Sequence, residues 1–90
     1  MPETFGIGVA VEFMKKGEKV ARIGWYDKGL FLYYVPGEFY DPYTKIAKEL
    51  VNDDGKVPYA PYVAMKTVNG KVVPWLCSQT DLLATDWYIV

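Results

Sequence analysis

The stretch YVAMKTVNGKVVPWL, residues 62–76, decides the fold class, because an asparagine-glycine pair stands between its two apolar runs. Asn69-Gly70 is the preferred centre of a two-residue type I′ turn between antiparallel strands. Such a turn fixes the register, and the expected pairs are Thr67 with Val72, Met65 with Pro74 and Val63 with Leu76. We expect that face to be core, and the opposite face to carry Tyr62, Ala64, Lys66, Val73 and Trp75.

The sequence before this hairpin predicts another one. KVARIGW (residues 19–25) and LFLYYVP (residues 30–36) are rich in β-branched and aromatic residues, as strands are. YDKG (residues 26–29) joins them through a short turn that ends in glycine. DWYIV (residues 86–90) predicts a closing strand, in which Trp87 faces the core.

The N-terminal segment has the spacing of an amphipathic helix. Phe5, Val9 and Phe13 fall along one stripe. Thr4 can cap this helix and Gly17 can end it.

A second helix is predicted from Tyr43 to Val51, after Asp41-Pro42, with Ile46, Ala47 and Leu50 facing inward. The prolines of VPYAPY (residues 57–62) predict an extended segment that is not a central strand. The fold class is therefore α+β: one small domain over residues 1–90, with an antiparallel sheet built from two hairpins and one or two helices packed on it.

Composition narrows the function. Hydrophobic residues make up 51% of the 90 residues and aromatic residues 17%, which is more apolar surface than so short a chain can bury alone. We therefore expect a homo-oligomer or a bound ligand to cover part of it. With a net charge of −1, the chain lacks the excess of positive charge that nucleic-acid binding needs.

The lack of targeting signals in the sequence and the single cysteine predict a soluble intracellular protein. The start MPETFGIGVAVEF lacks the pattern of a signal peptide, and no segment has the roughly 20 apolar residues of a membrane span. Cys77 is the only cysteine, so no internal disulfide can form, which fits a reducing cytosol.

The chemistry of the side chains favours binding over catalysis. The chain has no histidine, and Cys77 has no basic neighbour in the sequence to activate it. No phosphate-cradling glycine motif and no cluster of metal ligands is present. We expect a protein without catalytic residues, metal or cofactor.

Ser78-Gln79-Thr80-Asp81 has the pattern of a capping box. In the simpler interpretation it only starts a short helix through Leu82 and Leu83. In the functional interpretation the helix start, with its hydroxyl groups and carboxylate, holds the phosphate and ribose of a nucleotide.

The tryptophans and Arg22 also have two interpretations. Trp25, Trp75 and Trp87 are core or interface residues in the simpler one, although the expected register places Trp75 beside Lys66. Arg22 lies in an apolar strand and needs either a carboxylate partner or a ligand phosphate. The candidate ligand-binding residues are Trp25, Arg22, Phe31, Met65, Lys66, Trp75, Ser78, Gln79, Thr80 and Asp81.

Two segments carry a resemblance to a known family. The opening, residues 5–25, ends in K-x-G-x-x-V-A-R-x-G-W, and residues 73–87 read VPW-x-x-SQTDLLA-x-DW. Together they resemble the Thoeris anti-defence two family, small phage and prophage proteins also catalogued as a domain of unknown function. Residues 37–59 match nothing recognisable in that family.

The resemblance implies a molecular sponge. Such a protein acts as a homotetramer in the cytoplasm of the infected bacterium. It binds a cyclised (glycocyclic) ADP-ribose signal, made by a TIR-domain enzyme from NAD, without degrading it, so that the Thoeris effector is not activated. Some members hold cyclic dinucleotides at a separate site. An interaction protein without a small ligand, and an enzyme that cleaves the signal, are the alternatives.

Overall fold

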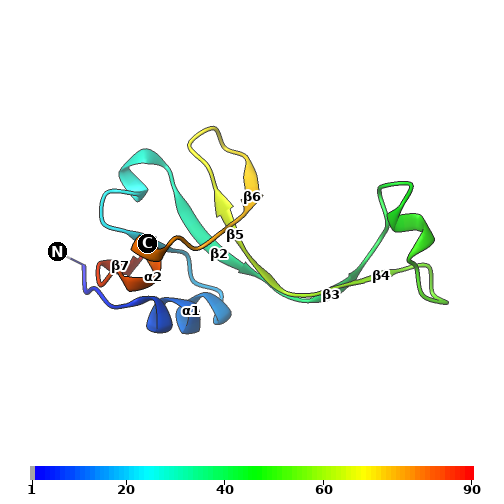
Figure 1. Ribbon diagram of the computed structural model, residues 1–90, viewed down its shortest axis with the longest axis horizontal. Coiled ribbons are helices and arrows are strands. Elements are labelled where there is room, and N and C mark those ends of the chain that lie inside the picture. Colours follow the sequence, from blue (N-terminus) through cyan, green and yellow to red (C-terminus); the bar gives the residue numbers. More distant parts are fainter. Residues whose placement is uncertain (1) are drawn as a thin grey trace.

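The computed structural model describes residues 2–90 and shows a five-stranded antiparallel sheet from which a two-stranded arm extends (Figure 1). The strand order in the sheet is β6-β5-β2-β1-β7, and β3 and β4 form the arm. The helices are α1 (Ile7–Lys15) and α2 (Gln79–Leu83), with short 3-10 helices at η1 (Tyr26–Lys28) and η2 (Ala47–Glu49). The strands are β1 (Val20–Arg22), β2 (Phe31–Val35), β3 (Glu38–Tyr40), β4 (Val57–Tyr59), β5 (Tyr62–Lys66), β6 (Val72–Pro74) and β7 (Trp87–Ile89). The predicted α+β class with an antiparallel sheet is confirmed.

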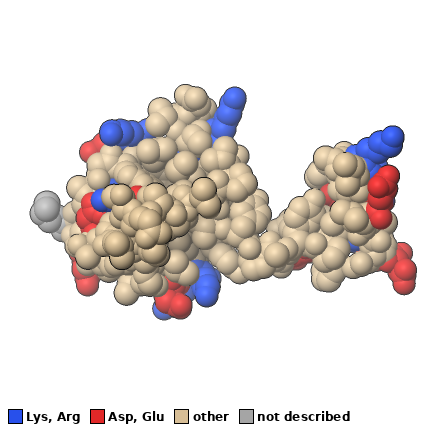
Figure 2. Space-filling view, in the orientation of Figure 1, with Lys and Arg blue, Asp and Glu red and all other residues tan. Residues whose placement is uncertain are grey.

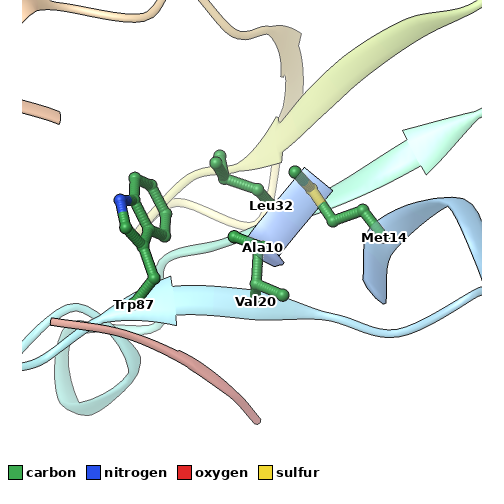
Figure 3. Packing of buried hydrophobic residues seen from close by; sticks show 5 residues of the cluster. All are labelled: Ala10, Met14, Val20, Leu32 and Trp87. Carbon is green, nitrogen blue, oxygen red and sulfur yellow. The ribbon is translucent and has the colours of Figure 1, made fainter. Parts of the chain in front are cut away.

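The core lies between α1 and one face of the sheet (Figure 3). Its fully buried members come from α1, β1, β2 and β7: Ala10, Met14, Val20, Leu32 and Trp87. The prediction that Trp87 faces the core is therefore confirmed. Within residues 2–90, no helix is long and apolar enough to span a membrane.

The first helix begins later than predicted. Thr4 does not cap it; the N-cap residue is Gly6, and α1 starts at Ile7. Phe5 instead bonds to β7: its amide donates to the Trp87 carbonyl at 2.9 Å, and the Trp87 amide donates back at 3.1 Å. Sheet pairing at Phe5 thus outweighs the local capping preference, because it joins the N-terminal segment to the buried indole.

The predicted register of the β5–β6 hairpin is wrong by one residue. Met65 pairs with Val73 and Lys66 with Val72, which leaves a three-residue loop between Thr67 and Lys71. Gly70 ends that loop in the left-handed region, at φ +78°, as a type I turn followed by a glycine requires. A slip of one residue exchanges the two faces of a strand. Trp75 therefore packs on the core beside Val63, and Leu76, predicted to be core, is 91% exposed.

The second predicted helix is also wrong. Residues 43–51 contain only the 3-10 turn η2, in which Ala47 is buried. Ile46 is 69% exposed and Leu50 is 60% exposed, so two of the three residues expected to face inward face outward. The arm has no sheet behind it against which a helix over these residues can pack.

The arm continues the sheet. The β2–β5 pairing runs from Phe31 opposite Lys66 to Val35 opposite Tyr62, and β3–β4 continues it in the same register, with Glu38 opposite Tyr59. Two prolines, at positions 36 and 61, interrupt the ladder where the arm begins, because proline has no N–H to donate. The expectation of an extended segment that is not a central strand is confirmed for β4, whereas Tyr62 already belongs to β5, an inner strand of the sheet.

Gly37 is required where the two strands of the arm leave the sheet. A Cβ at this position would lie 2.9 Å from Pro61 Cδ and 3.0 Å from the Tyr59 carbonyl oxygen. We expect Gly37→Ala to force the strands apart and to lower the free energy of unfolding by about 1–3 kcal/mol. Urea unfolding followed by circular dichroism measures this change.

Gly8→Ala is the matched control for Gly37→Ala. Nothing lies within 4 Å of a Cβ at Gly8, which is inside α1, so this change should raise the free energy of unfolding by about 0.5–1 kcal/mol. Equal effects of the two substitutions would contradict the assignment of a close strand approach at Gly37.

Candidate functional site

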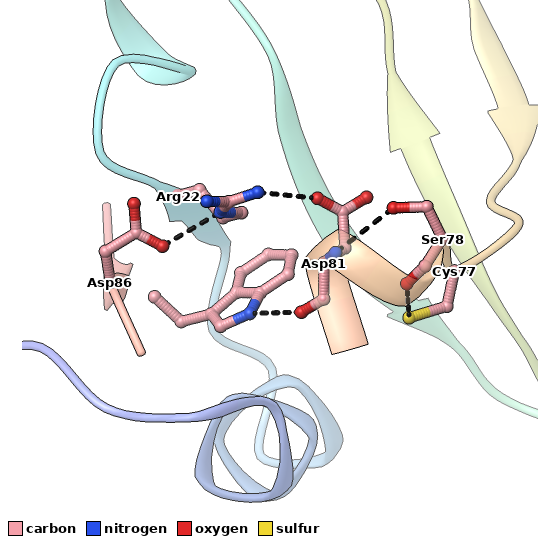
Figure 4. A network of polar contacts seen from close by, with 6 residues as sticks. Arg22, Cys77, Ser78, Asp81 and Asp86 are labelled. Carbon is pink, nitrogen blue, oxygen red and sulfur yellow. Dashed lines mark hydrogen bonds and ion pairs between the residues drawn. The ribbon is translucent and has the colours of Figure 1, made fainter. Parts of the chain in front are cut away.

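Arg22 is at the centre of an ion-pair cluster at the end of β1 (Figure 4). Its Nε donates to Asp86 at 2.8 Å and its Nη1 donates to Asp81 at 3.0 Å. The hydrogen bond to Asp86, and after it the one to Asp81, raises the pKa of the guanidinium above its ordinary value. The Arg22 side chain is 23% exposed and that of Asp81 16%. Of the two interpretations of Arg22, the structure shows the carboxylate partner.

The capping box is half formed. The Asp81 amide donates to the Ser78 hydroxyl oxygen at 3.1 Å, so Ser78 caps the five-residue helix α2. The Asp81 carboxylate does not return to the start of the helix but accepts from Arg22. The Asp81 carbonyl accepts a hydrogen bond from the Trp87 indole N–H at 3.1 Å. Ser78 and Asp81 therefore connect α2 to the core, while Gln79 and Thr80 are exposed on the helix.

The three tryptophans form one group on the core side of the sheet. Trp25 and Trp75 meet Trp87 edge-on, with ring centroids 5.1 Å and 5.8 Å away from it. The expectation that Trp75 lies on the same face of the hairpin as Lys66 is wrong, because the observed register turns Trp75 toward the core. Met65 packs there too. Packing in the core therefore accounts for all three tryptophans.

A groove on the opposite face of the sheet has the chemistry of a binding site. We call it the sheet-face groove; its volume is about 400 Å³, and it is lined by Gly17, Lys19, Phe31, Tyr33, Lys66 and Val72. Phe31, Lys66 and Val72 lie directly opposite one another on β2, β5 and β6. Because α1 and α2 both pack on the core side, this face carries no α-helix within residues 2–90.

Two ammonium groups converge on one aromatic ring in this groove. Lys19 Nζ lies 5.1 Å from the centroid of the Phe31 ring, and Lys66 Nζ lies 5.8 Å from it. Lys66 Nζ also donates to the Gly29 carbonyl at 3.0 Å, which holds its side chain in place. The side chain opposite Tyr33 is only that of Ala64, so the strand pairing leaves room above the sheet.

The groove suits an anion that carries a flat ring. Lysine ammonium groups donate to phosphate oxygens, and an aromatic face stacks on a base. No acidic side chain is among the residues that line it, so within the described chain nothing in the lining repels a phosphate. Phe31 and Lys66 were predicted from the sequence as ligand-binding residues, and the structure brings these two together.

Two other features are less suited to such a ligand. The larger groove, of about 520 Å³, is lined by Pro2, Glu3, Phe5, Val9, Phe13 and Ile89, and its one charged side chain is a carboxylate. Cys77 is not activated, since burial and then Asp81 raise the pKa of its thiol above the ordinary value. Residues 2–90 contain no cluster of three acidic, histidine or cysteine side chains that could hold a metal ion.

Comparison with known proteins agrees with the motifs. The family model described as the Thoeris anti-defense 2-like domain matches residues 5–90. This chain belongs to that family. Thoeris anti-defense 2 of Bacillus phage SP01 is 32% identical over 98 residues, which cover 100% of this chain and 99% of that protein. Membership confirms the resemblance and supports a phage anti-defence role.

The family match also includes the segment that seemed unrelated in sequence. Residues 37–59, which carry the arm, lie inside the matched range 5–90. The arm therefore lies within the matched extent of the Thoeris anti-defense 2-like domain.

Sequence reasoning missed four of the six residues that line the groove, and Lys19 and Tyr33 are the two of these that carry polar groups. The alternation of β2 contained the signal for Tyr33, because residues two apart on a strand share a face. Lys19 precedes β1, and only the pairing of β1 with β2 brings it to Phe31. No motif of this family member predicts that contact from the sequence alone.

Proposed function

We propose that this family member binds a cyclised ADP-ribose signal made by a TIR-domain enzyme and sequesters it without degrading it, so that the Thoeris effector is not activated. The observation that supports this most directly is the convergence of Lys19 and Lys66 on the Phe31 ring. A cyclised ADP-ribose presents a pyrophosphate, ribose hydroxyls and an adenine ring. The two ammonium groups suit the pyrophosphate. The Tyr33 hydroxyl suits the ribose hydroxyls, and the Phe31 ring suits the adenine.

The strength that a sponge needs points to more than one subunit. A stoichiometric binder with a nanomolar dissociation constant requires about −12 kcal/mol. Stacking on one ring contributes about 1–3 kcal/mol. Two hydrogen bonds from charged groups contribute about 1.5–3 kcal/mol each. Together these amount to roughly 4–9 kcal/mol, which is below the requirement, so we propose that the sponge is a homo-oligomer, a tetramer, in which a second subunit closes the groove.

The setting follows from the proposed role. A sponge for an immune signal meets that signal in the cytoplasm of the infected bacterium. The proposal includes no catalytic residue, metal or cofactor, because the groove offers donors and a stacking surface rather than an acid–base pair.

The experiment is to mix the purified protein with the cyclised ADP-ribose signal and to pass the mixture through a membrane that retains the protein. We expect the filtrate not to activate the Thoeris effector, and heat denaturation of the retained protein to release the signal unchanged. An active filtrate means that the chain does not sequester the signal. Release of a cleaved product instead means that the chain is an enzyme.

A parallel mixture with a cyclic dinucleotide tests the breadth of the site, because that ligand also joins phosphates to flat bases. Retention of both ligands with mutual competition indicates one shared groove, and retention without competition indicates a separate site. If the protein retains neither ligand, the chain is better described as an interaction protein that has no small ligand.

A further inference from the structure

A pocket lined mainly by tyrosine lies where the arm joins the sheet. Its volume is about 230 Å³, and four of the eight tyrosines of the chain line it. The residues that line this tyrosine pocket are Val35, Tyr40, Asp41, Tyr43, Tyr59 and Tyr62. The tyrosine pocket and the sheet-face groove have no lining residue in common, so the two are separate features of the surface.

Strand pairing brings these rings together from distant positions in the sequence. Tyr62 lies opposite Val35 at the end of the β2–β5 pairing, and Tyr59 is the last residue of β4, three positions earlier in the chain. The rings of Tyr40 and Tyr59 meet edge-on, with centroids 5.4 Å apart. The Tyr40 hydroxyl donates to the Pro36 carbonyl at 3.2 Å. These contacts hold Tyr40 and Tyr59 in place before any ligand binds.

The rings of the tyrosine pocket are not used for packing in the core. Tyr43 is 91% exposed, Tyr59 45% and Tyr62 44%. Within residues 2–90, neither the core cluster nor the side chains packed against it include any of the four tyrosines. Exposed aromatic side chains that gather in one hollow indicate a binding surface.

The charge around the pocket favours a cation. Asp41 is the one charged residue among those that line it in the described chain, and Lys56 donates to Asp41 Oδ1 from outside the lining. Figure 2 shows charged side chains of both signs at the outer end of the arm and few where the arm joins the body. The faces of aromatic rings carry partial negative charge, so rings beside a carboxylate attract a positive group and not a phosphate.

The hydrogen-bond acceptors in the pocket indicate which kind of cation fits. A primary ammonium group has three N–H donors and a guanidinium has five, and each donor needs an acceptor when it leaves water. The pocket offers only hydroxyl groups and one carboxylate, and Lys56 already occupies one oxygen of that carboxylate. A quaternary ammonium group has no N–H, and its methyl groups pack directly on ring faces. A volume of about 230 Å³ is also below the roughly 300–1,000 Å³ of pockets for larger ligands.

We propose that the tyrosine pocket binds a small organic cation of the quaternary ammonium type. The tyrosine rings surround the positive charge, and the Asp41 carboxylate balances it. The inference goes beyond the proposed function and does not depend on it, because Lys19 and Lys66, which serve the proposed function, do not line this pocket.

The experiment titrates the full chain with choline chloride at constant ionic strength and follows the tyrosine ring signals by nuclear magnetic resonance. The matched neutral probe is 3,3-dimethyl-1-butanol, in which carbon replaces the nitrogen of choline. Four cation–π contacts at exposed positions correspond to a dissociation constant that is roughly millimolar. We expect choline to bind in that range and the neutral probe to bind at least about 10-fold more weakly.

Two variants test the residues of the pocket. Tyr43→Leu removes one ring, and Asp41→Asn removes the carboxylate charge. Each should weaken choline binding by about two- to fivefold, as the loss of one exposed cation–π or ion-pair contact does. Both side chains are exposed, so the circular dichroism of each variant should remain that of a folded protein. Tyr26→Leu is the matched control, because Tyr26 is a half-exposed tyrosine on η1 outside the pocket, and it should bind choline as the parent does.

Four results overturn the inference. They are no binding of choline by the parent, equal binding of choline and the neutral probe, parental affinity of Tyr43→Leu or Asp41→Asn, and an equal loss of affinity in Tyr26→Leu. Retention of the cyclised ADP-ribose signal is measured on the same samples. A parent that retains the signal but not choline contradicts this inference alone, and a parent that binds choline but not the signal contradicts the proposed function alone.

Discussion

Trp87→Ala is expected to lower the free energy of unfolding by about 3–5 kcal/mol, because the indole is fully buried at the centre of the core. The substitution removes the edge-on contacts of two other tryptophans and the hydrogen bond to the Asp81 carbonyl. A small domain has about 5–15 kcal/mol of stability in total, so the variant loses a large part of it. Urea unfolding at one fixed protein concentration measures the loss, since stability of an oligomer depends on concentration.

Trp87→Phe is the control for this prediction. It keeps an aromatic ring in the core and removes only part of the volume, so we expect a smaller loss than for alanine. A loss below about 1 kcal/mol for Trp87→Ala would contradict the assignment of Trp87 as the centre of the core, since Trp→Ala in a packed core costs several times more.

Lys19→Ala and Lys66→Ala are expected to weaken binding of the cyclised ADP-ribose signal by about 10-fold to 150-fold each, the equivalent of about 1.5–3 kcal/mol for a hydrogen bond from a charged group. Lys19 is exposed, so its loss should leave the melting temperature unchanged. Lys66 also donates to the Gly29 carbonyl, so its variant should melt somewhat earlier. Isothermal titration calorimetry gives the affinities.

Lys28→Ala is the matched control, because Lys28 is an exposed lysine on η1 that does not line the groove. The Lys28→Ala variant should bind the signal with the same affinity as the parent protein. Weaker binding by all three variants to the same degree would mean that overall charge, and not the sheet-face groove, attracts the ligand. Parental affinity of Lys19→Ala and Lys66→Ala would place the site elsewhere on the chain.

Some of the candidate site could be predicted because its signals are local. Ser78 is followed three residues later by Asp81, and the Ser78 half of the predicted capping box formed. Arg22, alone among apolar neighbours, had to be paired, and it is. The carboxylates that pair with it, more than fifty residues away, carry no local mark of that role. Because the Asp81 carboxylate is paired with Arg22, the polar segment 78–81, one of the two interpretations of which was a ligand site, connects α2 to β1.

The α+β class, the two hairpins and a buried Trp87 were determined by the sequence alone, because alternation, turn residues and apolar spacing act over a few neighbouring positions. Tertiary structure decided which face of β6 is core. One extra residue in the loop at Gly70 slipped the register and moved Trp75 from the face that carries Lys66 to the core beside Trp87. Lys19 and Lys66 meet at Phe31 only because β1, β2 and β5 lie side by side. Such contacts depend on the pairing of distant strands, whose free energy no short window of sequence contains.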